Sequence, residues 1–232
     1  MVIGHGSIAN IFKGEFDNDD SIIIFASGVS NSSENRKSEY LRETKLLTKT
    51  LLNFPQKKII YFSSIYSKHV NSDYFNHKEL MENLIVEKSK NFIIIRLPQI
   101  ISNSGNQNNL INFLVNSIKN NCSLEIQKNV SRALIDIDDL KKVTLEVIKN
   151  FNNKVLNFSK IEEFLVIDLC NMIFTILNCN VDIIEVPAKF NTPNLENSPE
   201  IDNILENLIE KENYTNKILK KYLTNGNSNR IL

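Results

Sequence analysis

The stretch Met1-Val2-Ile3-Gly4-His5-Gly6-Ser7-Ile8-Ala9 decides the fold. A short β-branched run leads directly into Gly-x-Gly-x-x-Ala and then into a helical pattern over residues 7–15. In such a strand–turn–helix, the first glycine permits a tight turn, the second lets a pyrophosphate approach the backbone, and the alanine allows close helix–strand packing. The stretch predicts the first unit of a dinucleotide-binding sheet, although a purely structural turn would also explain two glycines.

Short apolar runs alternate with longer amphipathic stretches along the chain. Runs that are apolar throughout are typical of parallel strands covered on both faces, and their alternation with helices implies right-handed crossovers. The sequence therefore predicts an α/β fold with a Rossmann-like, doubly wound, mostly parallel sheet. The expected strands are residues 1–3, 21–26, 58–63, 92–96, 154–158 and 181–186, and the expected helices are residues 7–15, 34–53, 73–89, 110–120, 137–150 and 161–178.

The composition of the chain changes after Arg96. We expect residues 1–102 to form a Rossmann-like dinucleotide-binding core. Residues 103–223 are expected to hold the remaining strands and helices, with a small substrate-binding part at the carboxyl edge of the sheet. The Asn-, Gly- and Ser-rich residues 224–232 are predicted to be a flexible tail. The charges between residues 196 and 221 are typical of a solvated helix face.

Composition argues against several classes of function. Among 232 residues, 27 Lys and Arg balance 27 Asp and Glu, so no broad basic field favours nucleic acid or an anionic membrane. The apolar runs are far shorter than the roughly 18–20 residues that span a bilayer, and we expect no secretory leader. Cys122, Cys170 and Cys179 are odd in number and lack metal-ligand spacing. We therefore expect reduced thiols, no metal site and a cytoplasmic protein.

One part of a complete dinucleotide site is missing from the sequence. An acidic residue that binds the adenine ribose normally ends the second strand, about 20 residues after the glycines. Here the acidic residues 17–20 lead directly into the strand expected at residues 21–26, which leaves no room for a further strand, helix and strand. Either the adenosine half of a cofactor is loosely held, or Asp19 and Asp20 contact it in another geometry. An ordinary solvated turn explains the same residues.

Tyr74 and Lys78 stand one helical turn apart at the start of an expected helix, so their side chains point the same way. A phenol with a pKa near 10 is a poor acid or base at pH 7, and a neighbouring ammonium favours the phenolate and so lowers that pKa. The pair predicts proton transfer to or from a sugar or steroid oxygen. The Tyr-x-x-x-Lys pattern is unspecific by itself, so its context matters.

The ends of neighbouring strands supply that context. Ser63 and Ser64 end the third expected strand, at the carboxyl edge where the glycine turn also lies, and a hydroxyl there can hydrogen-bond a substrate oxygen. The small segment Ala26-Ser27-Gly28 ends the second strand. Leu97-Pro98-Gln99 follows the fourth and would pass close to a bound nicotinamide.

In this order the pieces resemble the extended short-chain dehydrogenase/reductase superfamily, in particular its NAD-dependent epimerase/dehydratase branch acting on nucleotide sugars, with a truncated adenosine-side half. The resemblance covers residues 1 to about 150. The sequence departs from the family in its two missing strands, in the short interval between Ser64 and Tyr74, and in its small substrate part. The matching pieces are Gly4-x-Gly6-x-x-Ala9, Phe25-Ala26-Ser27-Gly28, Tyr61-Phe62-Ser63-Ser64, Tyr74-x-x-x-Lys78, Arg96-Leu97-Pro98 and the segment from Ser131 to Leu140.

The resemblance implies a role for each residue of the site. Tyr74 would be the catalytic acid/base, Lys78 would hold the nicotinamide ribose and lower the Tyr74 pKa, and Ser64 or Ser63 would polarise the substrate carbonyl. Arg132 and Gln99 would bind the nucleotide sugar, although an ion pair of Arg132 with Asp136 or Asp138 is the alternative. The residues implied for NAD or NADP are Gly4, Gly6, Ser7, Ile8, Ala26, Ser27, Gly28, Lys78, Leu97 and Pro98.

The expected function is hydride transfer on a nucleoside-diphosphate sugar by a 4-ketoreductase or an epimerase. A dehydratase is less favoured, because Ile65-Tyr66-Ser67 offers no acidic residue directly after the serine strand. A non-catalytic or weakly cofactor-binding Rossmann protein and a reductase of a non-sugar carbonyl are the alternatives.

Two helices carry further expectations. In the helix over residues 34–53, Tyr40, Leu47 and Leu51 share a face with Thr44, and charges are expected on the other side. By the resemblance, this helix and that over residues 73–89 could join two copies as a homodimer. His77 points about 100° away from Lys78 and is expected at the surface, while His5 either contacts a pyrophosphate or has no role.

Overall fold

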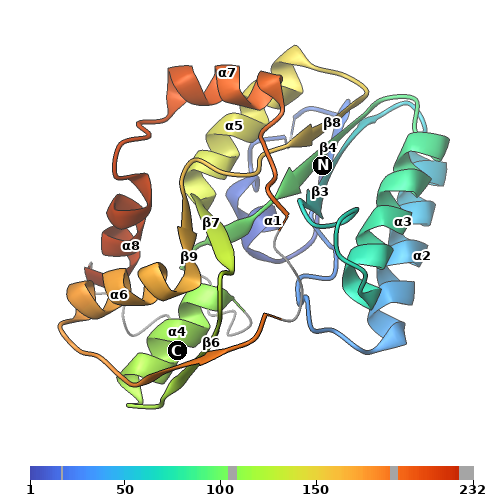
Figure 1. Ribbon diagram of the computed structural model, residues 1–232. Coiled ribbons are helices and arrows are strands. Elements are labelled where there is room, and N and C mark those ends of the chain that lie inside the picture. The colour runs from blue at the N-terminus through green and yellow to red at the C-terminus, as the bar shows by residue number, and fades with distance from the viewer. Residues whose placement is uncertain (17, 104–108, 189–192, 225–232) are drawn as a thin grey trace. The chain divides into compact units, whose positions relative to one another are not determined.

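The computed structural model describes residues 1–16, 18–103, 109–188 and 193–224 (Figure 1). The chain divides into two compact units. The sheet unit consists of Met1–Leu97, Asp138–Ser159 and Leu195–Leu208, and the second unit consists of Pro98–Ile137, Lys160–Asn194 and Ile209–Leu232. Of the residues 1–102 expected to form one core, those up to Leu97 lie in the sheet unit, which two later segments complete, and residues 98–102 lie in the second unit.

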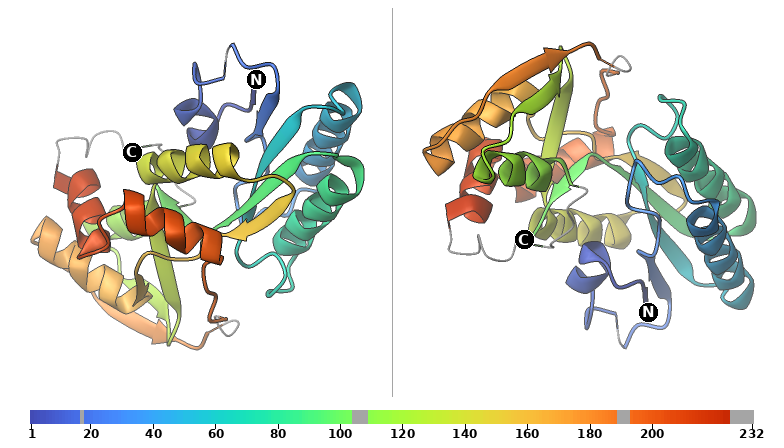
Figure 2. Two further views of the ribbon diagram at one scale, coloured as in Figure 1. Left: turned by 90° about the horizontal axis from the view of Figure 1, so that it is seen from above. Right: turned by 90° about the horizontal axis from the view of Figure 1, so that it is seen from below.

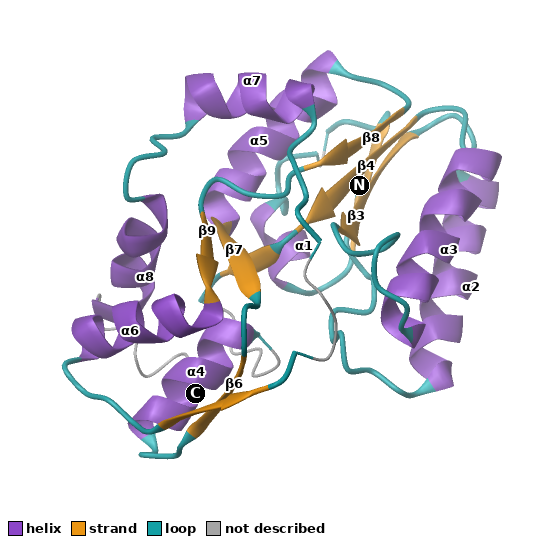
Figure 3. Ribbon diagram, viewed as in Figure 1, coloured by secondary structure: helices purple, strands orange, loops and turns teal. Residues whose placement is uncertain are grey.

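A five-stranded parallel sheet is the centre of the sheet unit (Figure 3). Its spatial order is β1 (Val2–Ile3), β2 (Ile22–Phe25), β3 (Lys58–Ser64), β4 (Phe92–Leu97) and β8 (Lys154–Asn157), and each neighbouring pair is parallel. The continuous apolar runs form these strands because both faces of the sheet are covered. The predicted α/β class and mostly parallel sheet are confirmed.

Helices cover both faces of this sheet, as Figure 2 shows from two sides. Helices α2 (Lys37–Asn53) and α3 (Asp73–Lys88) pack on one face, where Leu47 and Met81 are fully buried against the strands. Helices α1 (Ser7–Ile11) and α5 (Ile137–Asn150) lie on the other face. There Phe12 stacks on Phe62 with 6.0 Å between ring centroids, and the Lys58 ammonium donates to the carbonyl of Ile148 at the end of α5.

β1 is an edge strand of the sheet. This agrees with the prediction that the two strands usually found beyond it are missing. In a complete doubly wound sheet the strand order reverses beside the first strand, and the second half of the sheet extends from there. In this chain the described residues between α1 and β2 form turns and no strand, so β1 pairs with β2 alone. The sheet therefore keeps the half that holds β2, β3 and β4.

In the described part of the second unit, two small sheets and three helices surround a core of their own, in which Leu114, Leu169 and Leu219 are fully buried. β5 (Gln99–Ile101), β7 (Ser131–Asp136) and β9 (Glu163–Leu165) form one sheet, and β6 (Leu124–Gln127) pairs with β10 (Ile183–Val186) in the other. The helices are α4 (Leu110–Lys119), α6 (Val166–Leu177) and α8 (Tyr214–Thr224). Helix α7 (Pro199–Leu208) belongs to the sheet unit.

Several helices differ from the expectation, and the one predicted over residues 34–53 begins at Lys37. The predicted helix over residues 7–15 ends at Ile11. The one predicted over residues 161–178 starts at Val166, because β9 pairs antiparallel with β7. Residues 196–221 hold two helices whose buried side chains include Ile201 and Leu219, so the solvated-face interpretation describes only their outer sides. Of the expected tail, residues 225–232 lie outside the described residues. Within the described chain, no helix has the length and apolarity needed to cross a membrane.

Candidate active site

The glycine turn after β1 has the shape that a phosphate cradle needs. Gly4 has φ +131°, and a Cβ there would overlap the carbonyl of Ala26, so only glycine fits. At Gly6 no atom lies within 4 Å of the place of a Cβ, which leaves the backbone open to a ligand. Gly6 is the N-cap of α1, so Ser7 and Ile8 form its first turn. His5 is exposed beside them.

The segment after β2 lies beside this turn. Ala26 N–H donates to the carbonyl of Ile3 at 2.8 Å, which ties the segment to β1. The Ser27 carbonyl and hydroxyl both accept from the Arg42 guanidinium at 3.2 Å. A Cβ on Gly28 would lie 2.6 Å from Nζ of Lys78. The segment predicted to contact a cofactor therefore also covers the lysine predicted to be catalytic.

Tyr74 and Lys78 lie together at the start of α3, as the sequence predicts. Ser72 caps the helix by accepting from the backbone N–H of Phe75 at 3.3 Å, which fixes where the helix begins. The Lys78 Nζ lies 5.7 Å from the centroid of the Tyr74 ring. The Tyr74 side chain is half-buried, and among the described residues its hydroxyl has no hydrogen-bond partner.

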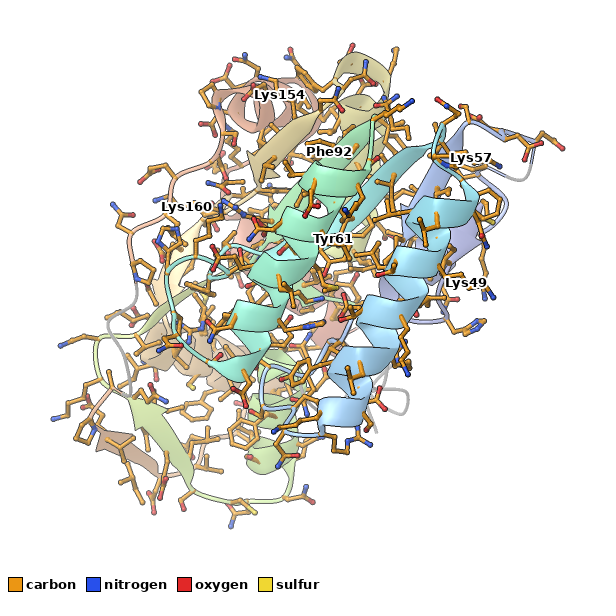
Figure 4. All side chains as sticks on the ribbon, turned by 90° about the vertical axis from the view of Figure 1, so that its right-hand side faces the viewer. Lys49, Lys57, Tyr61, Phe92, Lys154 and Lys160 are labelled. Carbon is orange, nitrogen blue, oxygen red and sulfur yellow. The ribbon has the colours of Figure 1, made fainter. Side chains whose placement is uncertain are left out.

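Lys78 is directed into the fold rather than into an open site. Its side chain is 3% exposed, and Nζ donates to Oε1 of Glu43 at 3.4 Å and to the hydroxyl of Tyr61 at 3.2 Å. An ammonium has three N–H donors, so one remains after these two bonds. Figure 4 views this side of the sheet, with α2 and α3 in front and Tyr61 labelled.

Glu43 is the residue of this site that the sequence analysis missed. It lies on α2 with its side chain 0% exposed, on the face where only uncharged residues were expected. Oε2 accepts from the backbone N–H of Val29 at 2.7 Å, and Oε1 accepts from the Tyr61 hydroxyl at 2.7 Å. Its position one helical turn before Leu47, on the core-facing stripe, was the available signal.

His77 corrects a second expectation. It is 7% exposed, and its Nε2 lies 3.0 Å from Oε2 of Glu43. His77 and Lys78 point in directions about 100° apart around α3, but α2 packs beside this helix and the two oxygens of Glu43 reach both residues. The predicted surface position of His77 is therefore wrong.

The electrostatics around Tyr74 are the reverse of what the pair of residues suggested. Burial raises the pKa of Tyr74, and the Glu43 carboxylate raises it further. Burial also lowers the pKa of Lys78, against the opposing effect of Glu43. Burial alone would raise the pKa of Glu43, but the Lys78 charge and the hydrogen bonds outweigh it and lower this pKa to about 2. The Glu43 carboxylate thus largely cancels the electrostatic effect of the Lys78 ammonium on the pKa of Tyr74.

The structure separates the two candidate serines. The Ser63 hydroxyl donates to Oε1 of Glu82 at 2.6 Å, and Arg96 makes a 2.6 Å ion pair with the same buried carboxylate. The Ser64 hydroxyl accepts from the backbone N–H of Tyr66 at 3.3 Å, and among the described residues its own proton goes to no acceptor. Ser64 therefore has a donor available for a ligand, whereas Ser63 uses its donor within the fold.

The remaining predicted residues follow β4. Leu97 ends β4 and is buried, and Pro98 begins the second unit. Gln99 pairs in register with Leu134 within that unit. Arg132 is half-buried on β7, and its guanidinium donates to the carbonyl of Ser131 at 2.7 Å.

Asp136, one of the alternative ion-pair partners of Arg132, is bound within the second unit by other residues. Its carboxylate accepts from Lys221 at 2.6 Å and from the Tyr222 hydroxyl at 2.9 Å. Asp138, the other alternative, belongs to the sheet unit. A hollow in the second unit, lined by Asn121, Ser123, Asn180, Val181 and Asp182, contains none of the predicted site residues.

No protein-family model and no curated protein sequence matches this chain. Solved structures do match it. A dTDP-4-dehydrorhamnose reductase from Clostridium acetobutylicum is 14% identical, with a TM-score of 0.67 over 95% of this chain and 96% of that one. UDP-N-acetylglucosamine 4-epimerase from Methanobrevibacter ruminantium, in complex with UDP-N-acetylmuramic acid, is 14% identical, with a TM-score of 0.68 over 94% and 78%.

A third match adds a dehydratase. The dTDP-glucose 4,6-dehydratase from Bacillus anthracis, in complex with NAD, is 15% identical, with a TM-score of 0.68 over 93% of this chain and 77% of that one. These proteins are enzymes that act on nucleotide sugars. The similarity establishes that this chain has their Rossmann-type fold, which is the fold that the sequence motifs predict.

Proposed function

We propose that this chain is an extended short-chain dehydrogenase/reductase of the epimerase/dehydratase type, an NAD(P)-dependent 4-ketoreductase or epimerase of a nucleoside-diphosphate sugar. The observation that carries the proposal is the Tyr74 hydroxyl at the carboxyl edge of the sheet, to which none of the described residues gives a hydrogen-bond partner, while Lys78 Nζ lies 5.7 Å from its ring. A phenol in that position is available to a substrate oxygen. The shared fold supports the proposal, because its neighbours include reductases and epimerases.

Each group at the edge then has a task. The Gly4–Gly6 turn binds the pyrophosphate of NAD or NADP, and the Ala26–Gly28 segment lies beside the cofactor. A nicotinamide held there would supply the chemistry of hydride transfer at a ring carbon of the sugar. Tyr74 transfers the proton of the sugar oxygen, and Ser64 donates a hydrogen bond to that oxygen. In the second unit, Arg132 provides a planar donor suited to a diphosphate.

Replacement of Tyr74 tests the enzyme assignment. Tyr74→Phe keeps the ring and should abolish turnover of UDP-, GDP- or dTDP-linked 4-keto sugars while the circular dichroism spectrum stays unchanged. Tyr40→Phe is the matched control, because among the described residues the Tyr40 hydroxyl bonds only the carbonyl of Glu34. Activity retained by Tyr74→Phe would refute the role of Tyr74.

Absorbance of the nicotinamide separates the two reactions. A ketoreductase oxidises its cofactor in each turnover, so the absorbance of the reduced nicotinamide falls. An epimerase returns the cofactor unchanged, and the absorbance stays constant while the sugar product appears. If none of the nucleotide sugars binds, a non-sugar carbonyl becomes the substrate to test.

A non-catalytic or weakly cofactor-binding protein is the second candidate, and the edge position of β1 favours it. Without strands beyond β1, the adenosine half of a dinucleotide has no neighbouring half-sheet to bind. Calorimetry with NADH, NADPH and reduced nicotinamide mononucleotide tests this. We expect the dissociation constants of the mononucleotide and of NADH to differ by less than about tenfold, which is about 1.4 kcal/mol in binding free energy. Absence of binding by all three at millimolar concentration would favour the non-catalytic candidate.

We also propose a cytoplasmic location and a homodimer. The location is supported by Cys122, Cys170 and Cys179, all of which are free thiols. The homodimer is supported by apolar side chains exposed on α2 and α3, of which Leu52 is the most exposed at 73%. Light scattering after size exclusion should give twice the mass of one chain, and Leu52→Glu should return it to the mass of a monomer.

A further inference from the structure

A buried group of charges lies behind the proposed acid/base pair. Glu43 is fully buried and accepts hydrogen bonds from four directions, although a carboxylate in that environment is costly unless it is paired and bonded. Two of its donors are the buried side chains of His77 and Lys78. An apolar side chain would fill this core position at a lower desolvation cost, so we look for an electrostatic role of the Glu43 carboxylate.

The geometry places the Lys78 ammonium between its counter-charge and two phenols. Nζ lies 3.4 Å from Oε1 of Glu43 and 5.3 Å from the centroid of the Tyr61 ring. The third neighbour, Tyr74, lies at 5.7 Å. The backbone of Gly28 covers the pair, because a Cβ there would meet both Nζ and Oε1 within 2.9 Å. Lys78 is therefore held beside Glu43 by the Gly28 backbone and by its hydrogen bond to Tyr61.

This arrangement decides what Lys78 can do to Tyr74. An isolated ammonium near a phenol favours the phenolate, whereas an ammonium paired with a carboxylate has a much weaker net field. The pKa of Tyr74 is raised by burial and then by Glu43, in agreement with that balance. At neutral pH a phenol of this kind is protonated, so it can donate a proton but cannot act as a base.

We propose that Glu43 is a positioning residue that holds and neutralises Lys78 from inside the fold, so that Tyr74 stays a protonated phenol and serves as the proton donor in reduction of a carbonyl substrate. This inference rests on the proposed function and selects the reductase within it. The carbonyl carbon receives a hydride with its electron pair from a reduced nicotinamide, and the C=O π pair moves to oxygen. That oxygen takes the Tyr74 proton, and the resulting phenolate regains a proton from solvent.

The charged and titratable groups around the Lys78–Tyr74 pair come from three elements. Helix α2 contributes Tyr40, Arg42 and Glu43, β3 contributes Tyr61, and α3 contributes Asp73, His77 and Glu82. Among these described groups, Glu43 alone both bonds Lys78 and acts on the pKa of Tyr74. Its replacement is therefore the most direct test.

The test is a pH titration of Tyr74 by NMR of isotope-labelled tyrosine rings in the full chain without cofactor, with the Tyr74 signal assigned by its loss in Tyr74→Phe. We expect the Tyr74 of the unsubstituted chain to remain a protonated phenol above about pH 10, the ordinary tyrosine pKa. In Glu43→Gln the midpoint should fall by at least about one pH unit. Glu39→Gln, one turn earlier on α2 and paired only at the surface with Arg42, is the matched control and should leave the midpoint unchanged.

Two results would overturn the inference. One is a Tyr74 midpoint that does not change in a folded Glu43→Gln variant. The other is a Tyr74 in the unsubstituted chain that titrates below about pH 10, the ordinary tyrosine pKa. This second result needs no variant at Glu43, so it can be obtained even if Glu43→Gln does not fold. Glu43→Asp, which restores a carboxylate, should return the midpoint toward that of the unsubstituted chain.

The titration also separates this inference from the proposed function. If Tyr74→Phe is fully active but the Tyr74 midpoint falls in Glu43→Gln, the enzyme assignment fails and the electrostatic role of Glu43 remains. If Tyr74→Phe is inactive but Glu43→Gln titrates like the unsubstituted chain, only the role of Glu43 fails. In an active Glu43→Gln variant, the alkaline limb of the pH–rate profile for carbonyl reduction should move to lower pH in step with the midpoint.

Discussion

Gly28 lies directly against Lys78, so that a Cβ added to Gly28 would come within 2.6 Å of the lysine Nζ. The atoms in the way are the ends of flexible side chains, but both side chains are buried and bonded to each other. Movement of either one would therefore break the Glu43–Lys78 pair. Gly28 is required because Lys78 and Glu43 leave no space for a Cβ, and not because of its backbone torsion angles.

Gly28→Ala should destabilise the chain by about 1–3 kcal/mol, the usual cost of overpacking a buried position. Urea denaturation followed by circular dichroism measures the change. Because the clash is with Lys78 and Glu43, the double variant Gly28→Ala with Lys78→Met should lose less than the sum of the two single variants. An alanine variant as stable as the unsubstituted chain would contradict the close contact.

Gly6→Ala should leave stability unchanged but weaken cofactor binding. Gly6 has φ −77°, which alanine adopts freely, and a Cβ there meets no atom within 4 Å. The added methyl group would occupy the space through which a pyrophosphate approaches the backbone. We expect the dissociation constant of NADH, measured by calorimetry, to rise at least about tenfold. Equal affinity in the two proteins would show that the turn is only structural.

Ser63 and Ser64 should respond differently to alanine. Ser64→Ala removes a hydroxyl whose proton is available to a substrate, so turnover should fall by about 10²-fold at nearly unchanged stability. Ser63→Ala removes one of the donors to buried Glu82 and should cost about 1–2 kcal/mol of stability. Steady-state kinetics and urea denaturation of both variants check the assignment. The reverse pattern would make Ser63 the substrate-binding serine.

Acid should remove the stability that Glu43 contributes. The pKa of Glu43 falls from 4.5 to about 2 on folding. A group whose pKa is lowered in the folded state stabilises it at pH values above the unfolded pKa. That contribution, on the order of 3 kcal/mol, should be lost progressively as pH falls from about 4.5 to about 2.

Urea denaturation at a series of pH values measures this loss. The free energy of unfolding of the unsubstituted chain should fall more steeply over this interval than that of Glu43→Gln. Parallel pH dependences of the two proteins would mean that folding does not lower the pKa of Glu43.

The sheet could be predicted from the sequence because its information is local. β2, β3 and β4 are centred on runs of consecutive apolar residues, and the structure places them within one or two residues of the expected bounds. The missing strands were also predictable, since the residues between α1 and β2 are too few to form them. Tyr74 and Lys78 were found for the same reason, as their relation is one helical turn.

The partners of these residues were not predictable, because they depend on contacts between distant segments. Glu43 bonds Tyr61, which is 18 residues away, and Lys78, which is 35 residues away. The periodicity of α2 places Glu43 on the same stripe as Leu47, but it does not show which distant side chains bond its carboxylate. β9 was missed similarly, because three residues form a strand only where β7 provides the pairing edge.

β1 adds two residues to the sheet and is held along one side only, through bonds such as that from the Ile24 N–H to the Met1 carbonyl. Segments held by few backbone bonds open locally at a lower free energy than the core. Backbone amides at this margin should therefore exchange with deuterium faster than those of β3 and β4. A ligand resting on Gly6 would slow that exchange, so occupancy of the turn can be measured from the N-terminal segment without any assay of turnover.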